Sequence, residues 1–300
     1  METAMTHTEV ALQNILVPTD FSATSERALQ YALTIAIRYH SRVRLVHVID
    51  RIGVEFAASE GMLEVSEVYE KMRHAAEERL LRQARELTAV RHQIHVTDGA
   101  PSEAVESLVR KYHMDLIVMG TRGATKLEKL VLGSTAEEIF RSATCPVLTI
   151  GPEAPVMAAS RGLNRILFPT DLMSDESGAL AHALSLAKRY QAHLSLLHVI
   201  PGMDPIPATE KEEFERPYFS RLARLIPQNA ELPYPPEYRI EYRDPAPDVI
   251  LRIAGEVAAD LIVLSVRPKE RWAARLPDKA YRIVAGAWCP VLTVQETESA

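Results

Sequence analysis

Apolar and polar residues follow one another along the chain in two distinct rhythms. Short apolar runs predict strands at residues 15–17, 43–49, 94–96, 116–119 and 147–150. Apolar residues at helical spacing predict helices at residues 28–37, 62–87, 104–112 and 135–141. Because strands and helices alternate, we expect a mostly parallel sheet with helices on both faces, which is an α/β fold.

The same pattern occurs twice. NILVPTD at residues 14–20 returns as RILFPTD at 165–171, and LVHVI at 45–49 returns as LLHVI at 196–200. DLIV at 115–118 and CPVLT at 145–149 return at 260–263 and 289–293. Four matches in one order are hard to explain by chance similarity of apolar strands. We therefore predict two copies of one domain, at residues 10–150 and 164–296, joined by a linker at 151–163 that is rich in Gly, Pro and Ala.

Two segments are less regular. Residues 201–236 are rich in proline, so we expect at most a short helix there, near residues 210–225. In the helix at 62–87 the apolar residues approximate one stripe, made of Met62, Val65, Tyr69, Met72, Ala76, Leu80 and Leu87. Its charged residues are most simply a solvated face. We expect this helix to cover the sheet and to lie outside any ligand site.

Composition narrows the class of protein. The chain has 300 residues and a formal net charge of −6, and each half carries 17 basic and 20 acidic residues. Neither half has the positive charge that binds a nucleic acid backbone, so no nucleic acid partner is expected. No apolar run approaches the ~20 residues of a membrane helix, and no signal peptide is evident. With two cysteines, too few for a disulfide framework, we expect a cytoplasmic protein without a membrane partner.

Histidines give weaker signals. His92 and His95 have a spacing that permits metal ligation, but no third ligand is near them in the sequence, so a surface strand is the simpler interpretation and no metal site is predicted. His47 and His198 recur at strand ends. A histidine satisfied by hydrogen bonds is the favoured interpretation there, with a catalytic base as the alternative.

The most informative segment is a glycine-containing loop. Gly120-Thr121-Arg122-Gly123 follows an apolar strand, and Gly133-Ser134-Thr135 follows after nine intervening residues, where a helix begins. Glycines let a ligand approach the backbone amides, and a helix N-terminus favours a phosphate. A capping box is the alternative, formed by Ser134 with Glu137 or by Thr135 with Glu138. Such a cap explains the hydroxyls but not three glycines at these spacings.

This loop resembles that of the universal stress protein family, which has Gly, two residues, Gly, nine residues, Gly, and then Ser or Thr. Val17-Pro18-Thr19-Asp20 and Cys145-Pro146-Val147-Leu148 also look like family signatures. The resemblance covers nearly the whole chain as a tandem pair. It implies two Rossmann-like domains, each an open five-stranded parallel sheet with helices on both faces that binds ATP at the carboxyl ends of its strands.

The resemblance also implies roles for individual residues. Asp20 would contact the ribose, Pro18 and Thr19 would line the base pocket, and the Val48 backbone would hold the adenine edge. The phosphates would lie against the loop, whose binding residues are Gly120, Arg122, Gly123, Gly133, Ser134 and Thr135. For Asp20 the alternative is a cap on the following helix, a role for which Ser22 competes.

The second copy departs from this pattern. Ser265 and Pro268 replace the first two glycines, and Pro277 and Asp278 replace the third glycine and the serine. Proline offers no amide hydrogen, and Asp278 places a negative charge where a phosphate would lie. Asp171 is retained, so a base and ribose without phosphates remain possible ligands. We therefore expect one ATP per chain, held by the first copy.

Two functions remain in competition. The first is a nucleotide-binding stress or signalling protein that changes shape or partners with ATP, with Mg²⁺ accompanying the nucleotide. The second is an enzyme that slowly hydrolyses ATP or transfers a nucleotide. A scaffold that nucleotide merely stabilises is a third interpretation. The family resemblance further implies that the two domains pack as a pseudo-dimer through their last strands, and a homodimer of whole chains is possible.

Overall fold

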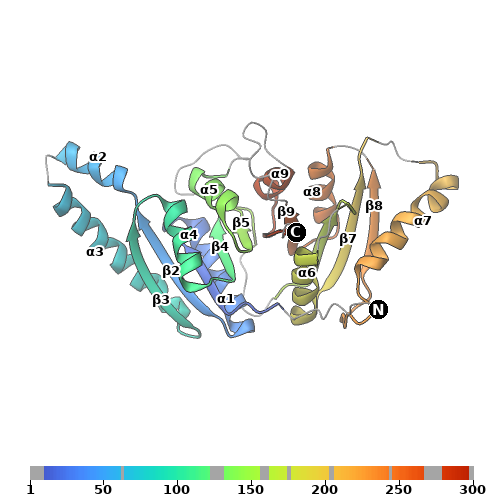
Figure 1. Cartoon of the computed structure of the whole chain (residues 1–300), viewed down its shortest axis with the longest axis horizontal. Helices are drawn as coiled ribbons and strands as arrows, with labels where there is room; N and C mark the ends of the chain where they lie inside the picture. The colour runs from blue at the N-terminus through green and yellow to red at the C-terminus, as the bar shows by residue number, and fades with distance from the viewer. Residues whose placement is uncertain are drawn as a thin grey trace. The chain divides into compact units, whose positions relative to one another are not determined.

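The computed structural model describes residues 10–61, 64–121, 132–155, 162–173, 177–202, 206–242, 245–266 and 279–296. The chain divides into two compact units, the first unit formed by Leu12–Arg161 and the second unit containing Gly162–Ala300. In each unit the described strands pair in parallel, and helices lie on both faces of the strands (Figure 1). The predicted α/β class and its Rossmann-like arrangement are confirmed.

The first unit has the strand order β3-β2-β1-β4-β5. Its strands are β1 Asn14–Pro18, β2 Arg42–Ile49, β3 Arg91–Asp98, β4 Leu116–Gly120 and β5 Val147–Ile150. Its helices are α1 Ala23–Tyr39, α2 Arg51–Gly61, α3 Val65–Ala84, α4 Pro101–Tyr112 and α5 Ser134–Ser142, with a 3-10 turn η1 at Arg85–Leu87. Helices α4 and α5 cover one face of the strands, and α1 and α3 lie on the other (Figure 1). In the strand order, the chain runs outward from β1 to β3 on one side and from β4 to β5 on the other. The order thus reverses between β1 and β4, and a ligand crevice is expected at that point.

The second unit repeats this plan with the order β8-β7-β6-β9-β10. Its strands are β6 Arg165–Thr170, β7 His193–Ile200, β8 Glu237–Tyr242, β9 Leu261–Val266 and β10 Val291–Gln295. Its helices are α6 Ser177–Tyr190, α7 Ala208–Leu225, α8 Ala246–Glu256 and α9 Lys279–Gly286.

The repeat extends to atomic detail. In the first unit the Asp115 carboxylate accepts hydrogen bonds from the backbone amides of Gln13 and Asn14, both at 2.8 Å. In the second unit Asp260 accepts in the same way from the amides of Asn164 and Arg165, at 2.9 and 3.0 Å. Each Asp immediately precedes the fourth strand of its unit, and its carboxylate holds the backbone at the start of the first strand. The Asp of the repeated DLIV segment is thus a structural anchor.

The segment between β2 and β3 differs from the sequence prediction. A separate helix, α2, precedes α3, and α3 begins at Val65; residues 62–63, the start of the predicted helix, lie outside the described residues. The predicted stripe is wrong in part, because Val65 and Met72 are 48% and 38% exposed. The buried residues of α3 and η1 are Val68, Ala76, Leu80, Ala84 and Leu87. Val68 is buried because it packs with Val54 and Ala58 of α2, a helix that the periodicity did not predict.

Helix α7 is longer than its prolines suggest. It spans 18 residues with Pro217 inside it, so the predicted position near residues 210–225 is correct to within two residues, although the helix is not short. Tertiary packing offsets the hydrogen bond that the proline removes. Leu222 is fully buried, and the buried Glu215 carboxylate on α7 accepts a 2.6 Å hydrogen bond from the Tyr242 hydroxyl at the end of β8.

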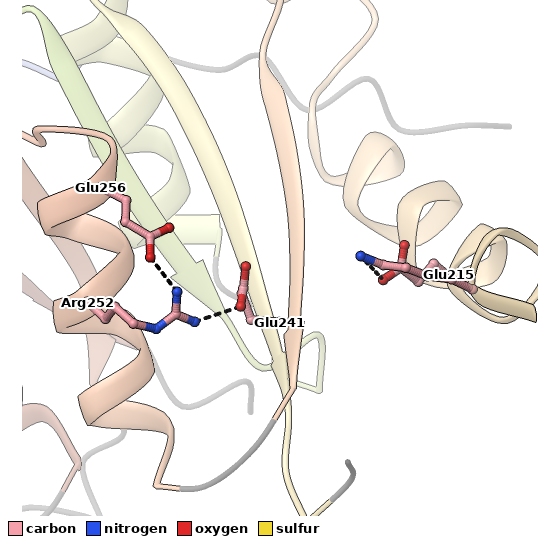
Figure 2. Close-up of polar contacts among 5 residues, drawn as sticks. Glu215, Glu241, Arg252 and Glu256 are labelled. Carbon is pink, nitrogen blue, oxygen red and sulfur yellow. Dashed lines mark hydrogen bonds and ion pairs between the residues drawn. The ribbon is translucent and has the colours of Figure 1, made fainter. Parts of the chain in front are cut away.

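Charged groups also join α8 to the neighbouring strand. Figure 2 shows Arg252 of α8 reaching Glu241 of β8 at 2.7 Å and Glu256 of its own helix at 2.5 Å, while Glu215 lies apart on α7. These two carboxylates raise the pKa of Arg252 above its usual range. Helices α7 and α8 are therefore both tied to strand β8 or its end by side-chain hydrogen bonds.

Candidate functional site

A cavity of about 360 Å³ lies at the carboxyl ends of β1, β2 and β4, where the strand order of the first unit reverses. Its volume falls within the usual range for small-molecule sites, roughly 300–1,000 Å³. The predicted site residues that the structure describes all line it: Pro18, Thr19, Asp20, Val48, Gly120, Gly133, Ser134 and Thr135. Arg122 and Gly123 lie outside the described residues.

The turn after β1 presents Asp20 to this cavity. The backbone amides of Phe21 and Ser22 donate to Thr19 Oγ1 and Asp20 Oδ1, both at 3.0 Å, and Phe21 takes a left-handed conformation with φ 62°. Ser22, and not Asp20, caps α1, because its side chain accepts from the amide of Ser25. The capping alternative for Asp20 is therefore wrong. Its exposed carboxylate can accept hydrogen bonds from ligand hydroxyl groups.

The backbone of Val48 faces the same cavity. In a parallel strand, residues two apart direct their amide and carbonyl to the same neighbour. The carbonyl of Val46 accepts from the amide of Thr19 on the β1 side at 2.8 Å, so Val48 also points to that side. The paired register of β1 ends at Pro18, opposite Val46. The backbone groups of Val48 thus extend beyond the paired part of β1, where a flat ring can replace the missing strand.

Gly120 is required by close packing. An added Cβ would lie 2.9 Å from the backbone carbon of Thr24 and 3.0 Å from the amide nitrogen of Ser25, at the start of α1. Any side chain there would push α1 away from the end of β4. Gly120 therefore keeps the helix and the strand close together at the base of the cavity.

The third glycine and the two hydroxyl residues begin α5. Gly133 is the N-cap and makes no side-chain capping bond, while Ser134 and Thr135 lie in the first helical turn. Glu137 pairs with Arg141, and Glu138 accepts from the Ser102 hydroxyl at 2.9 Å. The capping-box alternative is therefore wrong.

One detail of the phosphate prediction also changes. The amide of Gly133 donates to the carbonyl of Thr121 at 2.9 Å, so in this structure it closes the loop. Its φ of −61° is open to any residue, so the glycine is not demanded by backbone conformation. The amides of Ser134 and Thr135 have no intrahelical acceptor, and they remain the donors that a phosphate would meet.

His47, on β2, supports the turn after β1. Its Nδ1 donates to the carbonyl of Thr19 at 2.8 Å, and its ring lies 4.5 Å from that of Phe21. Burial lowers the pKa of His47, the bond to Thr19 opposes this shift, and the charge of Arg79 on α3 adds to it. A neutral imidazole that holds the turn is the result, in line with the favoured interpretation of this histidine.

Helix α3 touches the turn without lining the cavity. The Arg79 guanidinium lies 4.0 Å from the Phe21 ring centroid, and Thr19 Oγ1 donates to Gln83 Oε1 at 3.4 Å. None of the described residues of α3 is among those that line the cavity. This agrees with the expectation that α3 covers the sheet, although α3 also supports the turn from outside.

Sequence reasoning missed the apolar walls. They come from β2, α4, β4 and α5, and consist of Val46, Pro101, Val105, Met119, Ala136 and Ile139. These residues belong to ordinary apolar strands and helix faces, which look alike in the sequence whether they face a core or a ligand. The signal that finds them is the repeat, because the second unit places apolar residues at each matching position.

The second unit has a cavity at the equivalent place. It measures about 570 Å³, and its apolar walls include Leu197, Ala246, Ile250, Leu264, Ala280 and Ile283. Pro169, Thr170 and Asp171 line it as their counterparts do in the first unit. Ser265 stands at the position of Gly120, while Pro268, Pro277 and Asp278 lie outside the described residues.

Comparison with known proteins identifies the class to which this fold and this cavity belong. The model of the universal stress protein family matches residues 11–151 and again residues 162–295. The chain therefore belongs to the universal stress protein family, as a tandem of two family domains. None of the helices in the described parts of the chain is long and apolar enough to cross a membrane.

Individual relatives and solved structures resemble the chain to different extents. A universal stress protein of Methanocaldococcus jannaschii is 33% identical over 139 residues, which is 46% of this chain and 81% of the relative. A crystal structure of a universal stress protein from Archaeoglobus fulgidus covers 94% of this chain and 98% of its own, with a TM-score of 0.67 and 19% identity. Another solved universal stress protein, described in complex with cAMP, is 23% identical and covers 47% of this chain and 98% of its own, with a TM-score of 0.33.

Proposed function

We propose that the first unit binds one ATP in its cavity, and that the protein acts in stress response or signalling by changing shape or partners with nucleotide. Asp20 accepts from the ribose hydroxyls, the Val48 backbone pairs with the adenine edge, and Ser134 and Thr135 hold phosphate oxygens. Gly120, Arg122, Gly123 and Gly133 complete the loop, and Mg²⁺ accompanies the phosphates.

The observation that carries this proposal is the convergence of three kinds of group on one cavity. An exposed carboxylate at Asp20, backbone groups at Val48 beyond the paired part of β1, and first-turn amides of α5 lie along its wall. A nucleotide presents a matching set of groups: ribose hydroxyls, a flat ring edge with donors and acceptors, and an anion. A phosphate at the start of α5 gains from both the amides and the helix dipole.

We favour binding over turnover. His47, the basic side chain among the described lining residues, uses Nδ1 to hold Thr19, and burial lowers its pKa. Its Nδ1 is therefore committed to the turn. Turnover well below about 1 s⁻¹ is expected, since ordinary enzymes reach or exceed that rate.

A pair of matched variants tests the proposal. Asp20 and Asp171 occupy the same turn in the two units, and both are exposed. We expect Asp20→Ala to weaken ATP binding by about tenfold or more, because it removes a charged hydrogen-bond acceptor. Asp171→Ala should leave ATP affinity unchanged. Titration calorimetry measures both, and equal behaviour of the two variants would contradict the assignment.

The remaining expectations concern the whole chain. We propose that the linker at residues 151–163 separates domains at 10–150 and 164–296, and that these pack through their last strands. Pairing there would cover edge strands that otherwise invite aggregation. A cytoplasmic location and a homodimer of whole chains belong to the same proposal. Small-angle scattering of the monomeric chain with two separated lobes would contradict the packed pair.

A further inference from the structure

We propose that the cavity of the second unit binds a nucleoside without phosphates, with adenosine as the simplest representative. This inference rests on the proposed function, because it carries the base and ribose contacts of the first unit over to matching atoms of the second. It also assigns a ligand to a cavity that the ATP proposal leaves empty.

The half of the site that would meet the base and the ribose is reproduced in the second unit. The amides of Leu172 and Met173 donate to Thr170 Oγ1 and Asp171 Oδ1, at 2.9 and 2.8 Å, as Phe21 and Ser22 do in the first unit. Leu172 is left-handed with φ 58°, and His198 Nδ1 bonds to the carbonyl of Thr170 at 2.9 Å. Asp171 therefore occupies in the second unit the position that Asp20 occupies in the first unit.

The wall beside this half is also kept. Val199 takes the place of Val48 on the second strand of its unit and lines the cavity. Ala246 and Ile250 of α8 correspond to Pro101 and Val105 of α4, so this part of the apolar wall is the same in both units. The space for a flat ring is thus present in both units.

The half that would meet the phosphates is different. Ser265, at the position of Gly120, donates its hydroxyl to Glu296 Oε1 at 2.7 Å. The Glu296 carboxylate therefore lies against the end of β9. In the first unit the corresponding strand end, that of β4, is where the predicted phosphate loop begins. The carboxylate offers acceptor oxygens where a phosphate needs donors. The sequence continues this change, since Pro268 and Pro277 lack amide hydrogens.

The formal charges of the described lining residues balance. They comprise two carboxylates, Asp171 and Glu296, and two cations, Arg221 and Lys279. The Arg221 guanidinium donates to the carbonyl of Leu172, so it also holds the turn. The cavity volume of about 570 Å³ is large enough to hold a nucleoside.

The test is a titration of the full chain with adenosine while ATP saturates the first unit. We expect one adenosine per chain under these conditions. Asp171→Ala should weaken that binding by about tenfold or more, because it removes a charged acceptor. Asp20→Ala, studied without ATP, should retain the Asp171-dependent adenosine site. Glu296→Gln tests the phosphate end, and it should bring the binding of AMP closer to that of adenosine.

The outcomes separate the two proposals. If ATP binding depends on Asp20 but the ATP-saturated chain binds no adenosine, the inference fails and the proposed function stands. If ATP or AMP binds the second unit as tightly as adenosine and depends on Asp171, the exclusion of phosphates is wrong. If the chain binds no ATP, the proposed function fails, and adenosine binding that is insensitive to Asp171→Ala then overturns the inference as well.

Discussion

Placing a negative charge at Gly133 should abolish ATP binding while leaving the fold intact. Gly133 is the N-cap of α5 with φ −61° and ψ 147°, a conformation that any residue adopts. Aspartate is a good N-cap, worth a few tenths of a kcal/mol more than glycine, so Gly133→Asp should hold or slightly raise the melting temperature. Stability and nucleotide affinity are therefore expected to change independently.

The loss of affinity follows from charge repulsion. A carboxylate about 4 Å from a phosphate charge costs roughly 4 kcal/mol at an effective dielectric constant of 20, which corresponds to about a thousandfold in affinity. Gly133→Asn is the matched control, because asparagine has the same shape and also caps the helix but carries no charge. The difference between the two variants isolates the charge.

Titration calorimetry with ATP, together with thermal unfolding of each variant, provides the measurement. We expect the asparagine variant to lose less than about tenfold in affinity and the aspartate variant to show no detectable binding. Equal losses in the two variants would mean that side-chain volume is the cause. Wild-type affinity in Gly133→Asp would refute the placement of phosphates at the start of α5.

Four further results are expected. Tyr242→Phe should lower the free energy of unfolding by about 1–3 kcal/mol in urea titrations, because it leaves the buried Glu215 carboxylate without its 2.6 Å donor. Burial, and then the bond to Glu215, raise the pKa of Tyr242, so wild-type stability should fall as pH rises above about 10, and less so in this variant. Burial raises the pKa of Cys289 to about 12, so a thiol reagent at pH 8 should titrate at most one cysteine per native chain and two after denaturation. Glu70→Ala and Arg82→Ala, at exposed positions outside the cavity lining, should leave ATP affinity within about twofold, and a tenfold loss would place α3 in the site.

The sequence predicted most of the strands because buried parallel strands leave a clear apolar signal. Strand β5 agrees residue for residue with its prediction, and β1 extends by one residue at each end. The apolar pattern of a helix does not predict which of its residues are buried where that helix packs on another helix. Val68 is buried against α2, and no periodicity within α3 alone reveals that partner. The helix near residues 210–225 was placed correctly to within two residues, but the prolines suggested a short helix, and α7 continues through Pro217 because its tertiary contacts outweigh a local preference.

The polar part of the site was predictable, and its finer roles were not. The glycine spacing, together with the resemblance to the universal stress protein family, pointed to Asp20, Gly120 and Ser134, and all three line one cavity. The close approach of α1 that requires Gly120 is a contact between segments about a hundred residues apart, so no local pattern reports it. The hydrogen bond from the Gly133 amide to Thr121 is likewise visible only once the loop is closed.

The stoichiometry of ATP binding tests the central claim most directly. The two units present the same turn, at Asp20 and Asp171, but different phosphate ends, at Gly120 and Ser265. Losing two or three charge-assisted hydrogen bonds should weaken ATP binding to the second unit by at least about two orders of magnitude. Titration calorimetry of the whole chain should therefore give one ATP per chain at ligand concentrations that fill the first unit. Two equivalent ATP sites per chain, or none, would contradict the account.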